Sequence, residues 1–157
     1  MSPRILVVDD QRANVEMMAG VLRARGYEVL TALDGEEALE RVRAGRPDIV
    51  VSDILMPGMD GYEMCRRLRA DAATALLPVV LVTSLDAQKE RIKGLEVGAD
   101  DFLSKPVNWE ELFARVRSLL RVKSLQDELK GWNAKLEERV REQVAQLERL
   151  GRLKRFF

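Results

Sequence analysis

Apolar and polar positions alternate in blocks along the first 121 residues. Short apolar runs rich in β-branched residues predict five strands, at residues 5–8, 27–33, 49–51, 78–82 and 101–104. Between these runs, apolar residues recur every three or four positions and predict helices at 11–25, 36–44, 61–70 and 87–97, with a last helix from Trp109. The unbroken apolar run at 49–51 is typical of a strand buried on both faces of a parallel sheet.

Strand and helix alternate five times with short connections, and this order predicts an α/β fold. We expect a doubly wound parallel sheet of five βα units with helices on both faces. The flavodoxin-like strand order 2-1-3-4-5 places the first and third strands side by side at the switch point, where ligands bind beyond the carboxyl ends of the strands. The predicted organisation is one globular domain at 1–121, followed by a helical segment at 122–157.

The composition excludes several kinds of chemistry. The 157 residues contain no histidine, which rules out a phosphohistidine carrier, a Ser-His-Asp triad, a Cys-His dyad and a zinc site with histidine ligands. Acidic and basic residues balance at 26 each, so no net charge directs the chain to nucleic acid or to a membrane surface. No stretch is apolar for long enough to span a bilayer, and the single cysteine, Cys65, fits a reducing cytoplasm.

Three aspartates follow two strands that the expected strand order places side by side. Asp9 and Asp10 come after the first strand, and Asp53 comes after the apolar run of the third. Carboxylates this close raise one another's pKa or require a cation. A cluster of oxygen ligands suits a hard divalent ion, and few protein ligands completed by water suit Mg²⁺. Taken alone, the pair Asp9-Asp10 could equally cap the next helix.

Two more polar groups end neighbouring strands, Thr83 after the fourth and Lys105 after the fifth. A hydroxyl and an ammonium beside a metal–carboxylate site form a receptor for a doubly charged tetrahedral anion. The set predicts that an aspartate accepts a phosphoryl group, and Asp53 is the expected acceptor because the other two form the metal-binding pair. Thr83 could instead cap a helix and Lys105 could be a solvated lysine, but their joint placement at strand ends favours the site.

The pattern resembles the receiver domain of two-component response regulators over residues 3–121. The residues that carry the resemblance are Asp9-Asp10, Asp53, the run Met56-Pro57-Gly58-Met59-Asp60-Gly61, Thr83 and Lys105-Pro106. The resemblance implies that residues 1–121 are a receiver domain and that its phosphodonor is a sensor histidine kinase. It also implies that the chain is no enzyme beyond self-phosphorylation from small phosphodonors and autodephosphorylation.

The resemblance assigns roles to these residues. Asp53 is the implied phosphoacceptor, and Asp10, Asp53 and the backbone carbonyl of Leu55 are the implied ligands of Mg²⁺, with Asp9 acting largely through water. Lys105 pairs with the phosphoryl group, and Thr83 moves to hydrogen-bond it.

Three further expectations concern the peptide bond, the switch and the lifetime of the phosphorylated state. Lys105-Pro106 is implied to be a cis peptide. Phe102 stands where the family keeps a switching aromatic, which transmits the event to the face formed by the fourth helix, fifth strand and fifth helix. Leu55 and Leu85 lie two residues beyond Asp53 and Thr83. Because neither leucine can orient an attacking water, we expect a long-lived acyl phosphate.

The helical pattern continues without a break into residues 122–157. An apolar seam at coiled-coil spacing consists of Val122, Leu125, Leu129, Trp132, Leu136, Val140, Val144 and Leu147. The two successive steps of four after Leu136 interrupt the heptad with a stutter. One solvated helix does not satisfy such a seam, so we expect a homodimer, a parallel coiled coil through the C-terminal helix. We also expect phosphorylation to shift the rotation or register of this helix.

Residues 147–157 resemble the junction ahead of class III adenylate/guanylate cyclase domains in receiver–cyclase fusions. This resemblance predicts a coiled-coil linker whose output domain, a nucleotide cyclase, is missing from this chain. Two other classes compete with a signalling module. A haloacid-dehalogenase-like phosphatase also uses an aspartyl nucleophile, Mg²⁺ and a lysine, but it separates its two acids by one residue, whereas Asp9 and Asp10 are adjacent. A structural coiled-coil adaptor with a degenerate receiver head would require a damaged acidic site.

Overall fold

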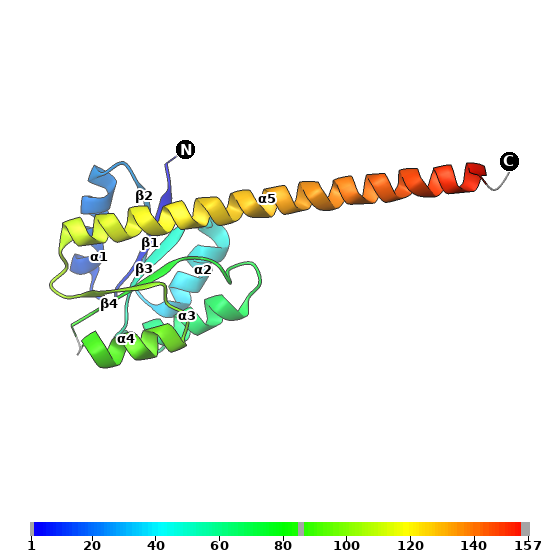
Figure 1. Cartoon of the computed structure of the whole chain (residues 1–157). Helices are drawn as coiled ribbons and strands as arrows, with labels where there is room; N and C mark the ends of the chain where they lie inside the picture. Colours follow the sequence, from blue (N-terminus) through cyan, green and yellow to red (C-terminus); the bar gives the residue numbers. More distant parts are fainter. Residues whose placement is uncertain (1, 85–86, 155–157) are drawn as a thin grey trace. The chain divides into compact units, whose positions relative to one another are not determined.

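The structure is a computed structural model that describes residues 2–84 and 87–154. Its strands and helices alternate in the predicted order (Figure 1). In chain order they are β1 (Arg4–Val8), α1 (Arg12–Ala24), β2 (Glu28–Ala32), α2 (Gly35–Gly45), β3 (Ile49–Asp53), α3 (Gly61–Ala70), β4 (Val79–Thr83), α4 (Ala87–Glu96), β5 (Asp101–Ser104) and α5 (Trp109–Lys154). The predicted bounds differ from these by one or two residues, as is usual at helix and strand ends.

The strands form one parallel sheet in the order β2-β1-β3-β4-β5, which confirms the predicted doubly wound topology. The register sets where each strand ends. Val8 of β1 pairs with Ser52 of β3, and Asp53 pairs with Val82 of β4. The carboxyl ends of β1, β3 and β4 therefore lie at the same edge, where the sequence predicts the site.

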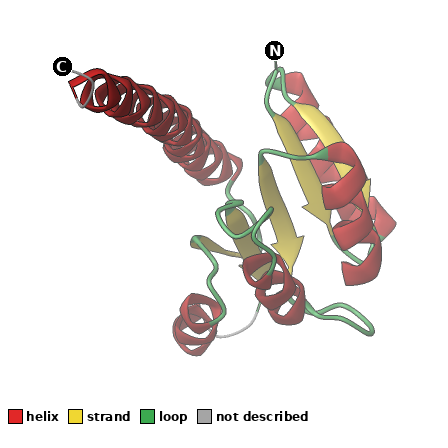
Figure 2. Ribbon diagram, turned by 90° about the vertical axis from the view of Figure 1, so that its right-hand side faces the viewer, coloured by secondary structure: helices red, strands yellow, loops and turns green. Residues whose placement is uncertain are grey.

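Helices flank the strands of the sheet (Figure 2). Alternate residues of each strand point to opposite faces and form two apolar clusters. One cluster joins Leu6, Val50 and other strand residues to α2 and α3. The other joins strand residues such as Val7 and Val51 to α1 and to residues 112–116 of α5. Burial on both faces explains why β1, β3 and β4 read as continuous apolar runs rather than as alternating ones.

Two helices begin at aspartates that act as N-caps. The Asp34 carboxylate accepts a hydrogen bond from the Glu37 N–H at 2.7 Å and so caps α2. Asp60 accepts from the Glu63 N–H at 2.8 Å and so starts α3 directly after the loop that follows β3. These caps set where α2 and α3 leave the carboxyl edge of the sheet.

The chain divides into two compact units, Met1–Lys123 and Ser124–Phe157. The described part of the second unit is a single helix that Gly131 does not interrupt. Its seam side chains are exposed in the single chain, with Leu129 at 61% and Trp132 at 60%. Over the described residues, no helix has the length and apolar character needed to cross a bilayer.

Candidate functional site

The carboxylates of Asp9, Asp10 and Asp53 come together at the carboxyl edge of the sheet. One oxygen from each lies within 4.8 Å of the others. Asp53 is the last residue of β3, and Asp9 directly follows the adjacent β1, so the strand order alone accounts for their approach. Asp9 and Asp53 are buried, with 6% and 9% exposure, whereas Asp10 is exposed.

Backbone N–H groups orient two of these carboxylates. Oδ1 of Asp9 accepts from the Gln11 N–H at 2.9 Å, and Oδ1 of Asp53 accepts from the Ile54 N–H at 2.8 Å. The N-cap position of α1 belongs to Gln11, so neither Asp9 nor Asp10 occupies it. This geometry counts against the alternative in which the acid pair only caps a helix.

Lys105 reaches the cluster from the end of β5. Its Nζ lies 3.1 Å from Oδ2 of Asp53 and 3.5 Å from Oδ2 of Asp9. The backbone N–H of Lys105 donates to the carbonyl oxygen of Thr83 at 2.8 Å, and the Lys105–Pro106 peptide is cis. The ammonium thus bridges carboxylates from two strands.

Burial and neighbouring charge shift the pKa of both partners of this ion pair. Burial raises the pKa of Asp53 above its ordinary 3.8, and the charge of Asp9 adds to the rise, while Lys105 opposes it. Burial lowers the pKa of Lys105, but the hydrogen bond and charge of Asp53 outweigh this effect and leave it above 10.5. The lysine therefore stays charged. Its charge does not fully offset the effect of burial on the Asp53 carboxylate. Three carboxylates face one ammonium here, an excess of negative charge that a divalent cation would offset.

The donor set fits Mg²⁺ rather than a softer metal. Carboxylates supply all three side-chain ligand atoms of the group, and hard cations prefer oxygen ligands. The partial exposure of the group leaves room for the water ligands that Mg²⁺ usually keeps. The cluster can therefore hold a metal ion through Asp9, Asp10 and Asp53.

The structure also gives the positions of most of the other predicted residues. Thr83 is the last residue of β4, 1% exposed, and belongs to the same edge as Asp53. Leu55 follows Asp53 by two residues, and its side chain is 56% exposed. Phe102 lies inside β5 with its ring buried and close to Gly94 of α4. Leu85 lies outside the described residues.

Gly61 contributes to the site in a way that the sequence did not reveal, since it was singled out there only as part of the run at 56–61. Its N–H donates to the Ile54 carbonyl oxygen at 2.8 Å, and a Cβ at this position would lie 2.5 Å from the carbonyl oxygen of Asp53. Only glycine allows the start of α3 to approach the end of β3 so closely. The available signal was a glycine directly after the N-cap Asp60.

Comparison with known families identifies this arrangement. The family model described as "Response regulator receiver domain" matches residues 5–117. The chain belongs to the response regulator receiver family. The predicted recognition is thus confirmed, including the flavodoxin-like fold.

Curated relatives of this receiver are response regulators. It is 54% identical over 130 residues to the response regulator PleD of Caulobacter vibrioides, a match that covers 83% of this chain and 29% of PleD. It is 50% identical over 121 residues to the response regulator MprA of Mycobacterium tuberculosis, covering 77% of this chain and 52% of MprA. The chain therefore spans less than a third of the first relative and about half of the second.

Solved structures agree with the fold. A response regulator from Chloroflexus aurantiacus superimposes with a TM-score of 0.74 at 40% identity, covering 77% of this chain and 99% of that one. The chemotaxis protein CheY4 of Vibrio cholerae gives a TM-score of 0.72 at 33% identity, covering 76% of this chain and 99% of that one. Both matches cover nearly the whole of the solved chain, so the likeness extends over a complete receiver fold.

Proposed function

We propose that this receiver is the phosphoacceptor module of a two-component system and that Asp53 takes a phosphoryl group from a sensor histidine kinase. The observation that carries the proposal is the meeting of Asp9, Asp10 and Asp53 with Lys105 at one edge of the sheet. This group combines a nucleophilic carboxylate, a metal-binding set and a fixed positive charge.

In the proposed reaction, a carboxylate oxygen of Asp53 attacks the phosphorus of the donor. The bond from phosphorus to the donor nitrogen or oxygen breaks, and the leaving group keeps the electron pair. The products are an acyl phosphate on Asp53 and the dephosphorylated donor. Lys105, now 3.1 Å from Asp53, is placed to pair with an oxygen of the transferred group. From the end of the adjacent strand, the hydroxyl of Thr83 donates a hydrogen bond to an oxygen of that group.

Asp10, Asp53 and the Leu55 carbonyl, with Asp9 through water, are the proposed holders of Mg²⁺. The ion supplies positive charge that stabilises the transferring phosphoryl group. The oxygen-only donor set and its uncompensated charge support this assignment.

We further propose that the phosphorylated domain signals through α4, β5 and α5 into a dimer. Phe102 is the proposed switching residue of that face. The exposed seam of α5 pairs with the same seam in a second copy, since a helix with one apolar stripe gains stability only when that stripe is buried. The resemblance of residues 147–157 to a cyclase junction supports a nucleotide cyclase as the output domain, and the single cysteine supports a cytoplasmic location.

Family membership and site geometry favour this function over its competitors. A haloacid-dehalogenase-like phosphatase would turn over a small phosphoester, so sustained phosphate release from such a substrate would favour that class instead. A structural adaptor would not need the acidic group that Asp9, Asp10 and Asp53 form.

Phosphorylation by acetyl phosphate tests the proposal. Intact-mass analysis should show one added phosphoryl group, which forms in the presence of Mg²⁺ and does not form when EDTA is present during labelling. Asp53→Asn should abolish the label. Asp60→Asn is a matched control, because asparagine also caps helices and should preserve the start of α3. Equal labelling of Asp53→Asn and the wild type would overturn the proposal.

A further inference from the structure

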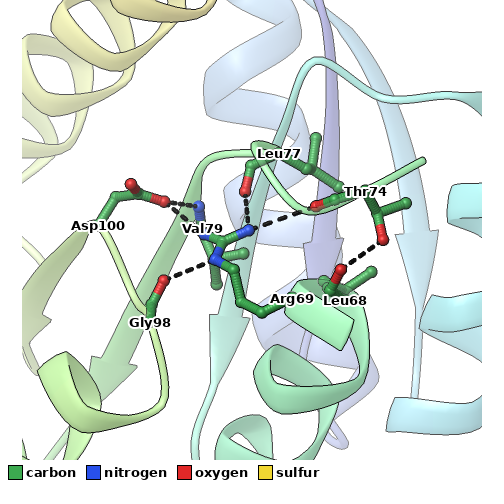
Figure 3. Close-up of polar contacts among 7 residues, drawn as sticks. All are labelled: Leu68, Arg69, Thr74, Leu77, Val79, Gly98 and Asp100. Atoms are coloured by element: carbon green, nitrogen blue, oxygen red, sulfur yellow. Dashed lines mark hydrogen bonds and ion pairs between the residues drawn. The ribbon is translucent and has the colours of Figure 1, made fainter. Parts of the chain in front are cut away.

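The guanidinium of Arg69, at the end of α3, holds several loops together (Figure 3). Its Nε donates to the Gly98 carbonyl oxygen at 2.8 Å. Its Nη1 donates to the carbonyl oxygens of Leu77 at 2.6 Å and Thr74 at 3.4 Å. Its Nη2 pairs with Oδ2 of Asp100 at 2.7 Å. With 20% of its side chain exposed, Arg69 is mostly shielded from water, unlike the surface arginines of the same helix.

Asp100 extends this network to the beginning of β4. Its Oδ2 accepts from the Val79 N–H at 2.8 Å, and its own N–H donates to the Val79 carbonyl oxygen at 2.9 Å. Arg69 therefore connects the end of α3, the loop before β4 and the turn between α4 and β5. Because β4 and β5 both begin here, the network lies at the amino edge of the sheet, opposite the aspartates.

The end of α4 is attached to this network through a close approach at Gly98. Gly98 has a φ of +91°, and a Cβ there would lie 2.9 Å from Cγ of Arg69. The next N–H, of Ala99, donates to the Gly94 carbonyl oxygen at 2.9 Å. Gly94 itself lies against the ring of Phe102, where a Cβ would be 2.7 Å from a ring carbon.

The two attachments of α4 differ in kind. Around Gly98 the turn is held by directional hydrogen bonds, among them bonds from a charged group, which are the strong ones. At Gly94 the side of the helix that faces the sheet lies against the ring of Phe102 and near Leu81, and these contacts are van der Waals ones. A ring can change its position without breaking hydrogen bonds, so we expect the contact between Gly94 and Phe102 to yield before the bonds at Gly98.

We propose that Arg69 is the fixed anchor of the turn between α4 and β5. A change at the phosphorylation edge then rotates α4 about Gly98, while the residues of that turn keep their positions. The event that drives the turning rests on the proposed function. The anchor itself is a property of the unphosphorylated domain and is measured without it.

Amide hydrogen exchange, followed by NMR in the unphosphorylated protein, tests the anchor. Arg69→Met should speed exchange at Val79 and Asp100 by about tenfold or more, because it removes the group that holds the Asp100 carboxylate in place. Arg67→Met is the matched control, an exposed arginine of the same helix that pairs with Glu63, and should change both rates by less than about twofold. Unchanged exchange at Val79 and Asp100 in Arg69→Met would overturn the anchor.

The same measurement with beryllofluoride and Mg²⁺, a phosphoryl mimic, tests the turning of α4. In the wild type, exchange at Gly94 and Leu95 should change, while Val79 and Asp100 should keep their rates. In Arg69→Met, and less strongly in Arg69→Lys, the change should spread to Val79 and Asp100, since a lysine cannot reproduce the planar fork of donors. A wild-type response that is equal at all four amides would overturn the proposal.

Failure of the proposed function is distinguishable from failure of the anchor. A protein whose ¹⁹F NMR spectrum shows no bound beryllofluoride, and which acetyl phosphate does not label, contradicts the proposed function and with it the turning of α4. The anchor is then still decided by the exchange rates of the unphosphorylated Arg69→Met and Arg67→Met variants.

Discussion

The carboxylate of Asp53 experiences opposing influences that set its charge. Burial and the neighbouring Asp9 favour the protonated form, and the ammonium of Lys105 favours the ionised form. Burial is the larger influence, so the pKa of Asp53 lies above 3.8. Even with Lys105 beside it, an ionised Asp53 therefore lowers the stability of the folded domain, and a bound divalent ion would offset this loss.

Asp53→Asn should raise the unfolding temperature in EDTA, because it removes this carboxylate. The gain should be smallest below pH 3.8, where Asp53 is protonated in both the folded and unfolded chain, and should grow as the pH rises through the raised folded-state pKa. With Mg²⁺ at about a hundredfold above its Kd, the wild type should gain about 2.7 kcal/mol that the variant lacks. Thermal unfolding by circular dichroism across pH measures both effects. A variant less stable than the wild type in EDTA at neutral pH would contradict this reasoning.

The side chain of Leu55 governs the expected lifetime of the acyl phosphate. It lies two residues beyond Asp53, is 56% exposed and offers no group that could orient water. Leu55→Asn should accelerate hydrolysis of the phosphorylated protein by about tenfold or more, because a polar side chain there can position the attacking water. Leu76→Asn is a control of similar exposure, 50%, in the loop before β4. The decay of the phosphorylated mass with time measures the effect, and wild-type hydrolysis within seconds in Mg²⁺ would contradict the expectation.

Sequence reasoning succeeds for residues whose position follows from their place at a strand end. Asp9, Asp53 and Lys105 each follow an apolar run, and the strand order then brings them together. The network of Arg69 and the close approach that requires glycine at position 61 could not be found this way. The contacts of Arg69 join residues about thirty positions apart, and they depend on loop geometry that apolar periodicity does not encode.

The joint between β3 and α3 determines how closely helix and strand approach at the site. Gly61→Ala should lower the free energy of unfolding by about 1–3 kcal/mol, because the added Cβ would meet the Asp53 carbonyl oxygen at 2.5 Å. Gly20→Ala in α1 should instead stabilise by about 0.5–1 kcal/mol, since nothing lies within 4 Å of its added Cβ. Urea unfolding of the two variants measures both changes. If both variants changed the free energy of unfolding in the same direction, the close approach of Gly61 to Asp53 would not be what requires glycine at this position.

The sequence predicted the strands and helices themselves better than the residues at which they begin and end. Burial on both faces leaves clear apolar runs, so the strands and their order followed from the pattern. The beginning of α1 was less readable: Asp9-Asp10 looked like a possible cap, yet Gln11 takes the N-cap position with no side-chain bond. Asp34 and Asp60, by contrast, occupy the N-cap positions of α2 and α3, and each accepts a hydrogen bond from the N–H three residues further on.

The whole molecule joins a receiver domain to a helix whose apolar seam is exposed in the single chain. In a Cys65→Ser background, Leu129→Cys should form a disulfide-linked dimer, whereas Lys130→Cys on the outer side of the helix should not. Positions 129 and 144 lie on either side of the stutter. Cross-linking of Leu129→Cys and of Val144→Cys should change when beryllofluoride and Mg²⁺ are added. Non-reducing gels measure both effects. Identical cross-linking with and without the mimic would contradict the expected shift of register.

The most direct test locates the phosphoryl group on the chain. Borohydride reduces an acyl phosphate of aspartate to homoserine, which marks the acceptor permanently for peptide mass spectrometry. After labelling with acetyl phosphate and Mg²⁺, the account predicts homoserine at position 53 and nowhere else. Homoserine at position 9 or 10, or a phosphoryl group that resists borohydride on a hydroxyl such as that of Thr83, would contradict it.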